Sequence, residues 1–156
     1  MHASISVRPS PGKGLGLFLV KGALPKDHMV AYMKNPASVP RSTWKAKERK
    51  GDRVKLWGRL YPHDIGIHDR QGDVWYDREM RGAKLTSPKQ KSNTLGGSVP
   101  LWYRLNHAKP PTVYMKLAVV DGRNTVAWFT KKGLRVRRGK PIELTFNYGV
   151  VPREWG

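Results

Sequence analysis

One stretch near the C-terminal end organises the interpretation of this chain: Pro141-Ile142-Glu143-Leu144-Thr145-Phe146-Asn147-Tyr148-Gly149. Apolar and polar side chains alternate from Ile142 to Asn147, which is the period-two pattern of a half-buried strand. Tyr148 follows at the end of this strand, and Gly149 allows the chain to turn. The pattern predicts a strand that delivers a tyrosine hydroxyl to an edge of the structure, although a lone Tyr more often only caps a core with its hydroxyl in water.

Two other segments of the sequence favour a functional role for Tyr148. The chain carries Gly12-Lys13-Gly14-Leu15-Gly16-Leu17-Phe18 near its N-terminus and Tyr103-Arg104-Leu105-Asn106-His107-Ala108-Lys109-Pro110 in its last third. Together with the stretch from Glu143 to Gly149, they resemble in order and spacing the three signature segments of SET-domain protein lysine methyltransferases. The resemblance extends from about Ser6 to Tyr148, which is most of the chain.

The resemblance implies a fold as well as an activity. It predicts a mainly β SET-domain fold of several small sheets with short helices, in which a C-terminal segment is threaded beside the Asn-His segment. We expect one domain over residues 1–156, with a variable insert at about 78–100 that shapes the substrate groove and a short tail at 150–156.

The activity implied is S-adenosylmethionine-dependent methylation of a protein lysine, most simply on a histone tail or another chromatin protein. On the family's pattern, Tyr148 orients the lysine amine and the methyl group, and Phe146 leaves room for a second or third methyl. His107 could serve as a general base, but we favour a role in holding the cofactor. Trp155 is a candidate lid over the ligand. The residues expected to bind the cofactor are Lys13, Gly14, Leu15, Gly16, Tyr103, Arg104, Asn106, His107 and Trp155.

The chain departs from the family's pattern at three positions. Ala108 stands where the family usually has Ser or Cys, Thr112 where it often has Asn, and Tyr103 where it frequently has Arg. These departures keep two alternatives open. One is a catalytically weak SET-like module that binds nucleic acid or chromatin, and the other is a methyltransferase for a non-histone protein such as a ribosomal one.

Composition narrows the remaining possibilities. With 156 residues and no Cys, the chain can bury a core but can form neither a disulfide nor a thiolate zinc site. His63 and His68 are five apart and would point to opposite faces of a strand, so we expect no metal site. No apolar run approaches the roughly 18 residues of a membrane span. We therefore expect an intracellular protein, located in the nucleus if it is eukaryotic or if it comes from a virus of a eukaryotic host.

The charge is strongly positive and unevenly spread. Thirty Lys and Arg against eleven Asp and Glu give +19, and residues 61–100 are nearly neutral while both ends are basic. Such a field attracts polyanions, and nucleic acid is the obvious one, although a solvated surface that only keeps the protein soluble remains an alternative. The expected DNA or nucleosome contacts are Arg135, Arg137, Arg138, Lys45, Lys47, Arg49 and Lys50.

The rest of the sequence predicts short elements joined by turns. Trp44 and Trp57 stand among basic residues and are interpreted either as core anchors, which is slightly favoured, or as stacking platforms for bases. We expect strands near 5–7, 15–19, 29–33 and 134–136, helical turns at 42–50, a long loop at 78–100, and hairpins at 64–77, turning at 70–72, and at 113–130, turning at 121–124.

Overall fold

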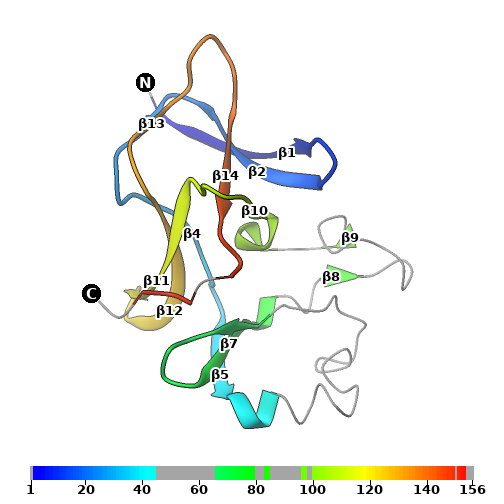
Figure 1. The fold of residues 1–156 in the computed structure, drawn as a ribbon, viewed down its shortest axis with the longest axis vertical. Coiled ribbons are helices and arrows are strands. Elements are labelled where there is room, and N and C mark those ends of the chain that lie inside the picture. The colour runs from blue at the N-terminus through cyan, green and yellow to red at the C-terminus, as the bar shows by residue number, and fades with distance from the viewer. Residues whose placement is uncertain are drawn as a thin grey trace.

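The chain folds into several small sheets rather than one large sheet (Figure 1). The computed structural model describes residues 2–44, 66–79, 83–84, 96–97, 100–149 and 151–153. The expectation of a mainly β architecture built from small sheets is confirmed. Its strands are β1 (Ser4–Ser10), β2 (Gly14–Lys21), β3 (Ala23–Leu24), β4 (Met29–Tyr32), β5 (Pro36–Pro40), β6 (Ile67–His68), β7 (Asp73–Asp77), β8 (Ala83–Lys84), β9 (Gly96–Gly97), β10 (Asn106–His107), β11 (Val113–Val120), β12 (Arg123–Thr130), β13 (Leu134–Arg135) and β14 (Ile142–Phe146).

A four-stranded sheet brings together segments from both ends of the sequence, in the order β1-β2-β14-β10. The β1–β2 hairpin is antiparallel, and β14 adds to β2 in antiparallel register with Leu144 opposite Leu17. On its other side β14 pairs in parallel with β10, so that Asn106 lies opposite Thr145. This sheet therefore aligns the glycine-rich turn, the Asn-His segment and the C-terminal strand.

The expected half-burial of β14 holds only in part. Leu144 and Phe146 are buried as predicted, but Thr145 is also buried although it belongs to the face that was expected to be polar and exposed. The reason is that Thr112 packs alongside β14: its hydroxyl donates to the carbonyl of Glu143 at 3.0 Å and accepts from the N–H of Thr145 at 2.9 Å. The second half of the strand is thus covered on both faces.

The β11–β12 hairpin forms a second sheet with β4 and carries much of the core. Its turn contains only Asp121 and Gly122, with φ of 51° and 75°, which fits a two-residue turn whose twist matches the flanking strands. The expected four-residue turn is therefore too long, because residues 123 and 124 already belong to β12.

Stacked aromatic rings connect the core to the end of β14. Trp102 and Trp128 stack with centroids 5.4 Å apart and planes 5° apart, and Phe146 meets Trp128 edge-on at 5.7 Å. Trp102 belongs to the 3-10 helix η4 (Leu101–Arg104), which the sequence did not predict, and its indole N–H donates to the buried carboxylate of Asp77 at 2.7 Å. The core thus supports the strand that carries the candidate site.

Some of the other predicted secondary-structure elements agree with the structure and some do not. Strands were correctly expected around β1, β2, β4 and β13, and a hairpin around β6 and β7. Strand β3, which pairs with β13, was not predicted, and the expected long loop at 78–100 contains the paired strands β8 and β9. Helical residues begin at 41 and are described to 44, and Trp44 is buried, as a core anchor would be. Predictions for Trp57, Lys45, Lys47, Arg49, Lys50 and Trp155 lie outside the described residues.

The described C-terminal residues return to the second sheet. The backbone N–H of Arg153 donates to the carbonyl of Met115 at 3.0 Å, and its own carbonyl accepts from Leu117 at 2.9 Å. The Arg153 guanidinium lies 4.0 Å from the ring centroid of Tyr114. In the part of the chain that is described, no helix has the length and apolar character needed to cross a membrane.

Candidate functional site

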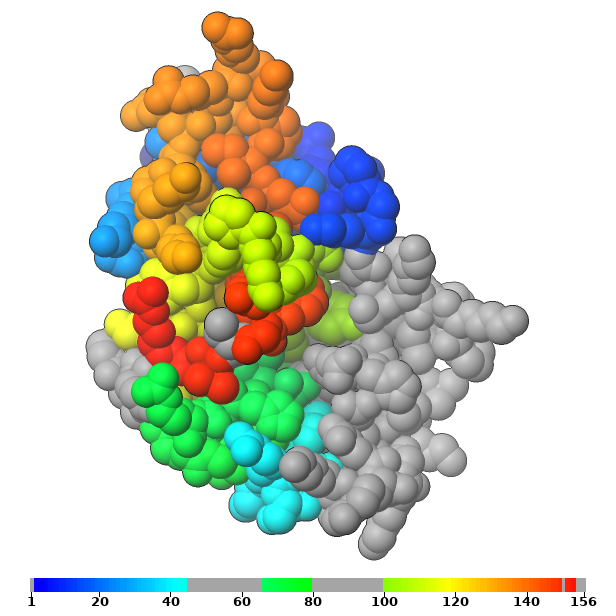
Figure 2. Space-filling model, in the orientation of Figure 1, coloured from blue at the N-terminus to red at the C-terminus, as the bar shows by residue number. Residues whose placement is uncertain are grey.

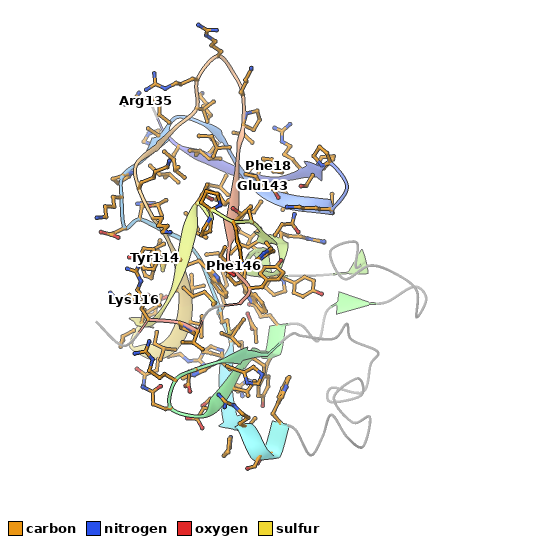
Figure 3. The ribbon with its side chains drawn as sticks, in the orientation of Figure 1. Phe18, Tyr114, Lys116, Arg135, Glu143 and Phe146 are labelled. Carbon is orange, nitrogen blue, oxygen red and sulfur yellow. The ribbon has the colours of Figure 1, made fainter. Side chains whose placement is uncertain are left out.

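The side chain of Asn106 joins three segments that are distant in sequence. Its amide donates to the carbonyl of Leu15 at 3.1 Å and to Oε2 of Glu143 at 2.8 Å. The other carboxylate oxygen, Oε1, accepts a hydrogen bond from the Ser10 hydroxyl at 2.9 Å. Figure 3 places Glu143 where β14 crosses the β1–β2 hairpin. One amide and one carboxylate therefore fix the glycine-rich turn, β10 and β14 to one another.

Gly16 lies directly against this cluster and has no room for a side chain. A Cβ at this position would lie 2.6 Å from Oε2 of Glu143 and 3.0 Å from Nδ2 of Asn106. Gly14, by contrast, is required for its backbone conformation, because its φ of 78° is disfavoured for residues with a Cβ. The two glycines thus serve different needs, one for close approach and one for the turn.

Lys13 and His107 extend the contacts between the same segments. The Lys13 ammonium donates to the carbonyl of His107 at 2.9 Å. His107 Nδ1 in turn accepts a hydrogen bond from the backbone N–H of Tyr148 at 3.0 Å. Because this acceptor nitrogen is already used to hold the backbone, the geometry favours a positioning role for His107 over the general base considered from sequence.

Tyr148 presents its ring to solvent while its hydroxyl is held by the protein. The side chain is 55% exposed, yet its hydroxyl donates to the carbonyl of Leu105 at 2.6 Å. The ring packs against Phe146, with centroids 4.7 Å apart, and against His107 at 5.2 Å. Burial of the hydroxyl end, and then the negative charge of Glu143, raise the pKa of Tyr148 to about 12. The phenol is therefore neutral at physiological pH.

Two of the expected cofactor-binding residues, Tyr103 and Arg104, belong to helix η4. Tyr103 is half-buried, packs against the core and meets the ring of Trp102 edge-on at 5.8 Å. Arg104 is buried, and this burial lowers its pKa from the ordinary value, with a smaller opposing effect from Tyr103. The hydrogen bonds described above bring together Lys13, Leu15, Asn106, His107 and Tyr148.

Three contributors were not identified from sequence as part of the site. Ser10 and Glu143 form the hydrogen-bonded cluster, and Leu105 supplies the carbonyl that holds the Tyr148 hydroxyl. Glu143 carried a usable signal, because it is the only acidic residue between Asp121 and Glu154 in an otherwise basic stretch. A backbone carbonyl such as that of Leu105 leaves no trace in a sequence pattern.

Comparison of the chain with protein-family models and with curated protein sequences finds no match.

The first prediction concerns the space around Gly16. Gly16→Ala should displace the Glu143 carboxylate from Asn106 and destabilise the protein by about 1.5–3 kcal/mol, the contribution typical of a hydrogen bond to a charged group. Chemical denaturation would measure the loss. Gly133→Ala is the matched control, since its Cβ would meet nothing closer than the Leu24 carbonyl at 3.8 Å. Equal stabilities for the two variants would contradict the crowding at Gly16.

The second prediction concerns the ionisation of Tyr148. With a pKa raised from 10.0 to about 12, Tyr148 should be no more than about one-tenth ionised at pH 11. The difference in tyrosinate absorbance between wild type and Tyr148→Phe measures this directly. Since the folded state binds this proton more tightly, the stability it contributes is complete below pH 10 and is lost as the pH rises toward 12. Half-ionisation near pH 10 would show that the hydroxyl is not held.

Proposed function

We propose that this chain is an S-adenosylmethionine-dependent protein lysine methyltransferase of the SET-domain type. The observation that carries the proposal is the convergence of the glycine-rich turn, the Asn-His segment and Tyr148 through Asn106 and His107. The parallel placement of β10 beside β14 supports the SET-like arrangement, because it sets the C-terminal strand next to the Asn-His segment.

The residues near the glycine-rich turn suit the cofactor chemically. Lys13 is exposed and offers a cation for the carboxylate of an amino-acid moiety, and a Cβ built at Gly12 would meet nothing within 4 Å, so the backbone there is open. Asn106 and His107 supply amide and imidazole groups from the adjacent strand. S-adenosylmethionine, when bound, would supply a methyl group on a positively charged sulfonium.

The orientation of the Tyr148 hydroxyl argues for alignment rather than base catalysis. Its single proton is donated to Leu105, so its lone pairs are free to accept a hydrogen bond from an incoming amine. A phenol with a pKa of about 12 yields almost no phenolate at neutral pH and is a poor base. Tyr148 would therefore hold the nitrogen lone pair in line with the methyl carbon, and such positioning can supply a large part of a rate enhancement.

The target lysine has to lose its proton before it can react. For an ordinary lysine this costs about 4 to 5 kcal/mol at pH 7, and the proton leaves to solvent. Contact of the amine with the apolar face of the Tyr148 ring, with loss of its water, would lower that cost, because an apolar environment disfavours an ammonium. The neutral amine would then be able to accept the methyl group that the bound cofactor would supply.

The departures at Ala108 and Thr112 are compatible with activity. Thr112 links the Asn-His segment to β14 through both its hydroxyl and its backbone, and Ala108 continues the parallel pairing by donating to the carbonyl of Phe146 at 3.3 Å. Both positions thus maintain the site without the side chains usual in the family. This favours an enzyme over a catalytically weak chromatin-binding module, with a histone or another nucleic-acid-associated protein as substrate.

The third prediction tests the role of Tyr148. Tyr148→Phe should lower kcat for methyl transfer by about 100-fold or more, since misplacement of reacting atoms by about 1 Å can cost that much. Binding of S-adenosylmethionine, measured by calorimetry, should change only a few fold because one hydroxyl is lost and little volume. Tyr114→Phe is the matched control, because it removes a hydroxyl bonded to Asp27. Absence of cofactor binding by the wild type would favour the non-catalytic module.

The fourth prediction concerns Phe146. Phe146→Tyr adds a hydroxyl within the contact between this ring and Tyr148, whose centroids are 4.7 Å apart. The smaller remaining space should shift the product from di- or trimethyl-lysine toward monomethyl-lysine, measured by mass spectrometry of a methylated peptide. Phe129→Tyr, on the half-buried outer part of β12, should leave the distribution unchanged. An unaltered product from Phe146→Tyr would show that this residue does not limit the space around the target lysine.

A further inference from the structure

An arginine occupies the tip of the turn between β13 and β14 in a conformation that arginine disfavours. Arg138 has φ of 54° and Gly139 has φ of 68°, and the N–H of Lys140 donates to the carbonyl of Arg137 at 3.0 Å. Two successive positive φ values define a two-residue turn in which Asn or Asp normally precedes Gly. A long charged side chain thus stands at a position where a short polar one would be less strained.

This turn forms the projecting end of the molecule. In Figure 1 the segment between β13 and β14 extends beyond the sheets, and Figure 2 shows residues 131–142 as a protruding knob. Leu134 is buried against Leu24 and the carbonyl of Gly22 accepts from the N–H of Val136 at 3.0 Å, so the base of the projection is fixed to β3. The cations on it are therefore presented by an ordered element.

The charged side chains of the projection and of the neighbouring N-terminal strands are all positive. Residues 1–26 and 131–142 contain ten Lys and Arg and no Asp or Glu. All ten side chains are exposed, and among the described residues no carboxylate forms an ion pair with any of them. We call this set the basic hairpin surface; its members are Arg8, Lys13, Lys21, Lys26, Lys131, Lys132, Arg135, Arg137, Arg138 and Lys140.

We propose that the basic hairpin surface binds the phosphate backbone of duplex nucleic acid. Exposed cations on an ordered projection gain by replacing the counterions of a polyanion, and a duplex carries more phosphate charge per unit length than a single strand. Binding to single strands ordinarily uses aromatic rings on which bases stack. The segments 2–26 and 131–142 contain one Phe, Tyr or Trp, the half-buried Phe18, and so offer few rings for stacking, which favours the duplex.

This surface shares only Lys13 with the candidate active site, and its other nine cations lie outside that site. Arg138 lies ten residues before Tyr148 along the segment that contains β14, and the extended chain from Lys140 to Tyr148 spans about 25 Å. A protein with +19 charge repels a free lysine-rich segment. A duplex held at the projection would offset this repulsion and raise the local concentration of a lysine-bearing partner bound to the same duplex. The binding itself does not depend on methyl transfer.

The fifth prediction is tested by direct binding without cofactor. Fluorescence anisotropy with a labelled 20-base-pair DNA of arbitrary sequence measures the affinity of the full chain across a series of salt concentrations. Replacing Arg135, Arg137 and Arg138 by Ala should weaken binding by about 10-fold or more near 0.1 M salt and reduce the log–log salt slope by about 2 to 3. The matched control replaces Lys34, Arg70 and Arg123, which are exposed cations outside the surface, and removes the same net charge.

A single substitution separates binding from folding. Arg138→Gly removes one cation but also relieves the positive φ, so it should raise the thermal midpoint while weakening duplex binding. Tyr148→Phe should bind the duplex as tightly as wild type, whatever its activity. Equal losses from the two triple variants would show only a delocalised charge effect and overturn the proposal. It would also be overturned if wild type fails to bind the duplex, or binds a single-stranded RNA of equal length as tightly.

Discussion

The hydrogen bonds of the Glu143 carboxylate are the interaction on which the rest of the site depends. Asn106 and Ser10 each donate to one of its oxygens, and these partners lie 37 and 133 residues away in sequence. A half-buried carboxylate requires such donors, because its charge is costly to remove from water without them. The same amide of Asn106 also holds the carbonyl of Leu15. The glycine-rich turn and the C-terminal strand are thereby positioned by a single buried side chain.

Tyr148 depends on this arrangement indirectly. Its backbone is held by His107 and its hydroxyl by Leu105, both of which flank Asn106 in the chain. The elements that fix Asn106 therefore also fix the tyrosine, whereas its ring contributes little to the buried core. The groups that support Tyr148 are therefore largely enclosed, while its ring is open to solvent. The raised pKa follows from the same geometry, because the hydroxyl is enclosed near a negative charge while the ring is not.

Local features of the sequence predicted local features of the structure. The alternation around Leu144 identified a strand. Asp121-Gly122 identified a turn, because Asp followed by Gly is a favoured pair for a turn that needs positive φ at both positions. Burial of Thr145 could not be predicted in the same way, since it results from Thr112 packing beside the strand after a long-range pairing has formed. Helix η4 was missed because Leu101–Arg104 has no helical period, and its Trp102 is placed by Asp77, which is 25 residues distant. The three segments of the site were found by resemblance, but the bonds that join them required the fold.

Strand β14 connects the basic projection at one end to Tyr148 at the other end. β14 is preceded by the turn at Arg138 and followed by Tyr148, so the sheet that holds the tyrosine also supports the basic projection. A strand paired on both sides, with β2 and with β10, is a rigid connection between them. A smaller residue at position 138, such as glycine, would relieve the backbone strain of the positive φ. Stability alone would therefore favour such a residue over arginine. The segment 131–142 contains no acidic residue, so the polyanionic partner proposed above would engage one end of the strand, while Tyr148 lies at the other end.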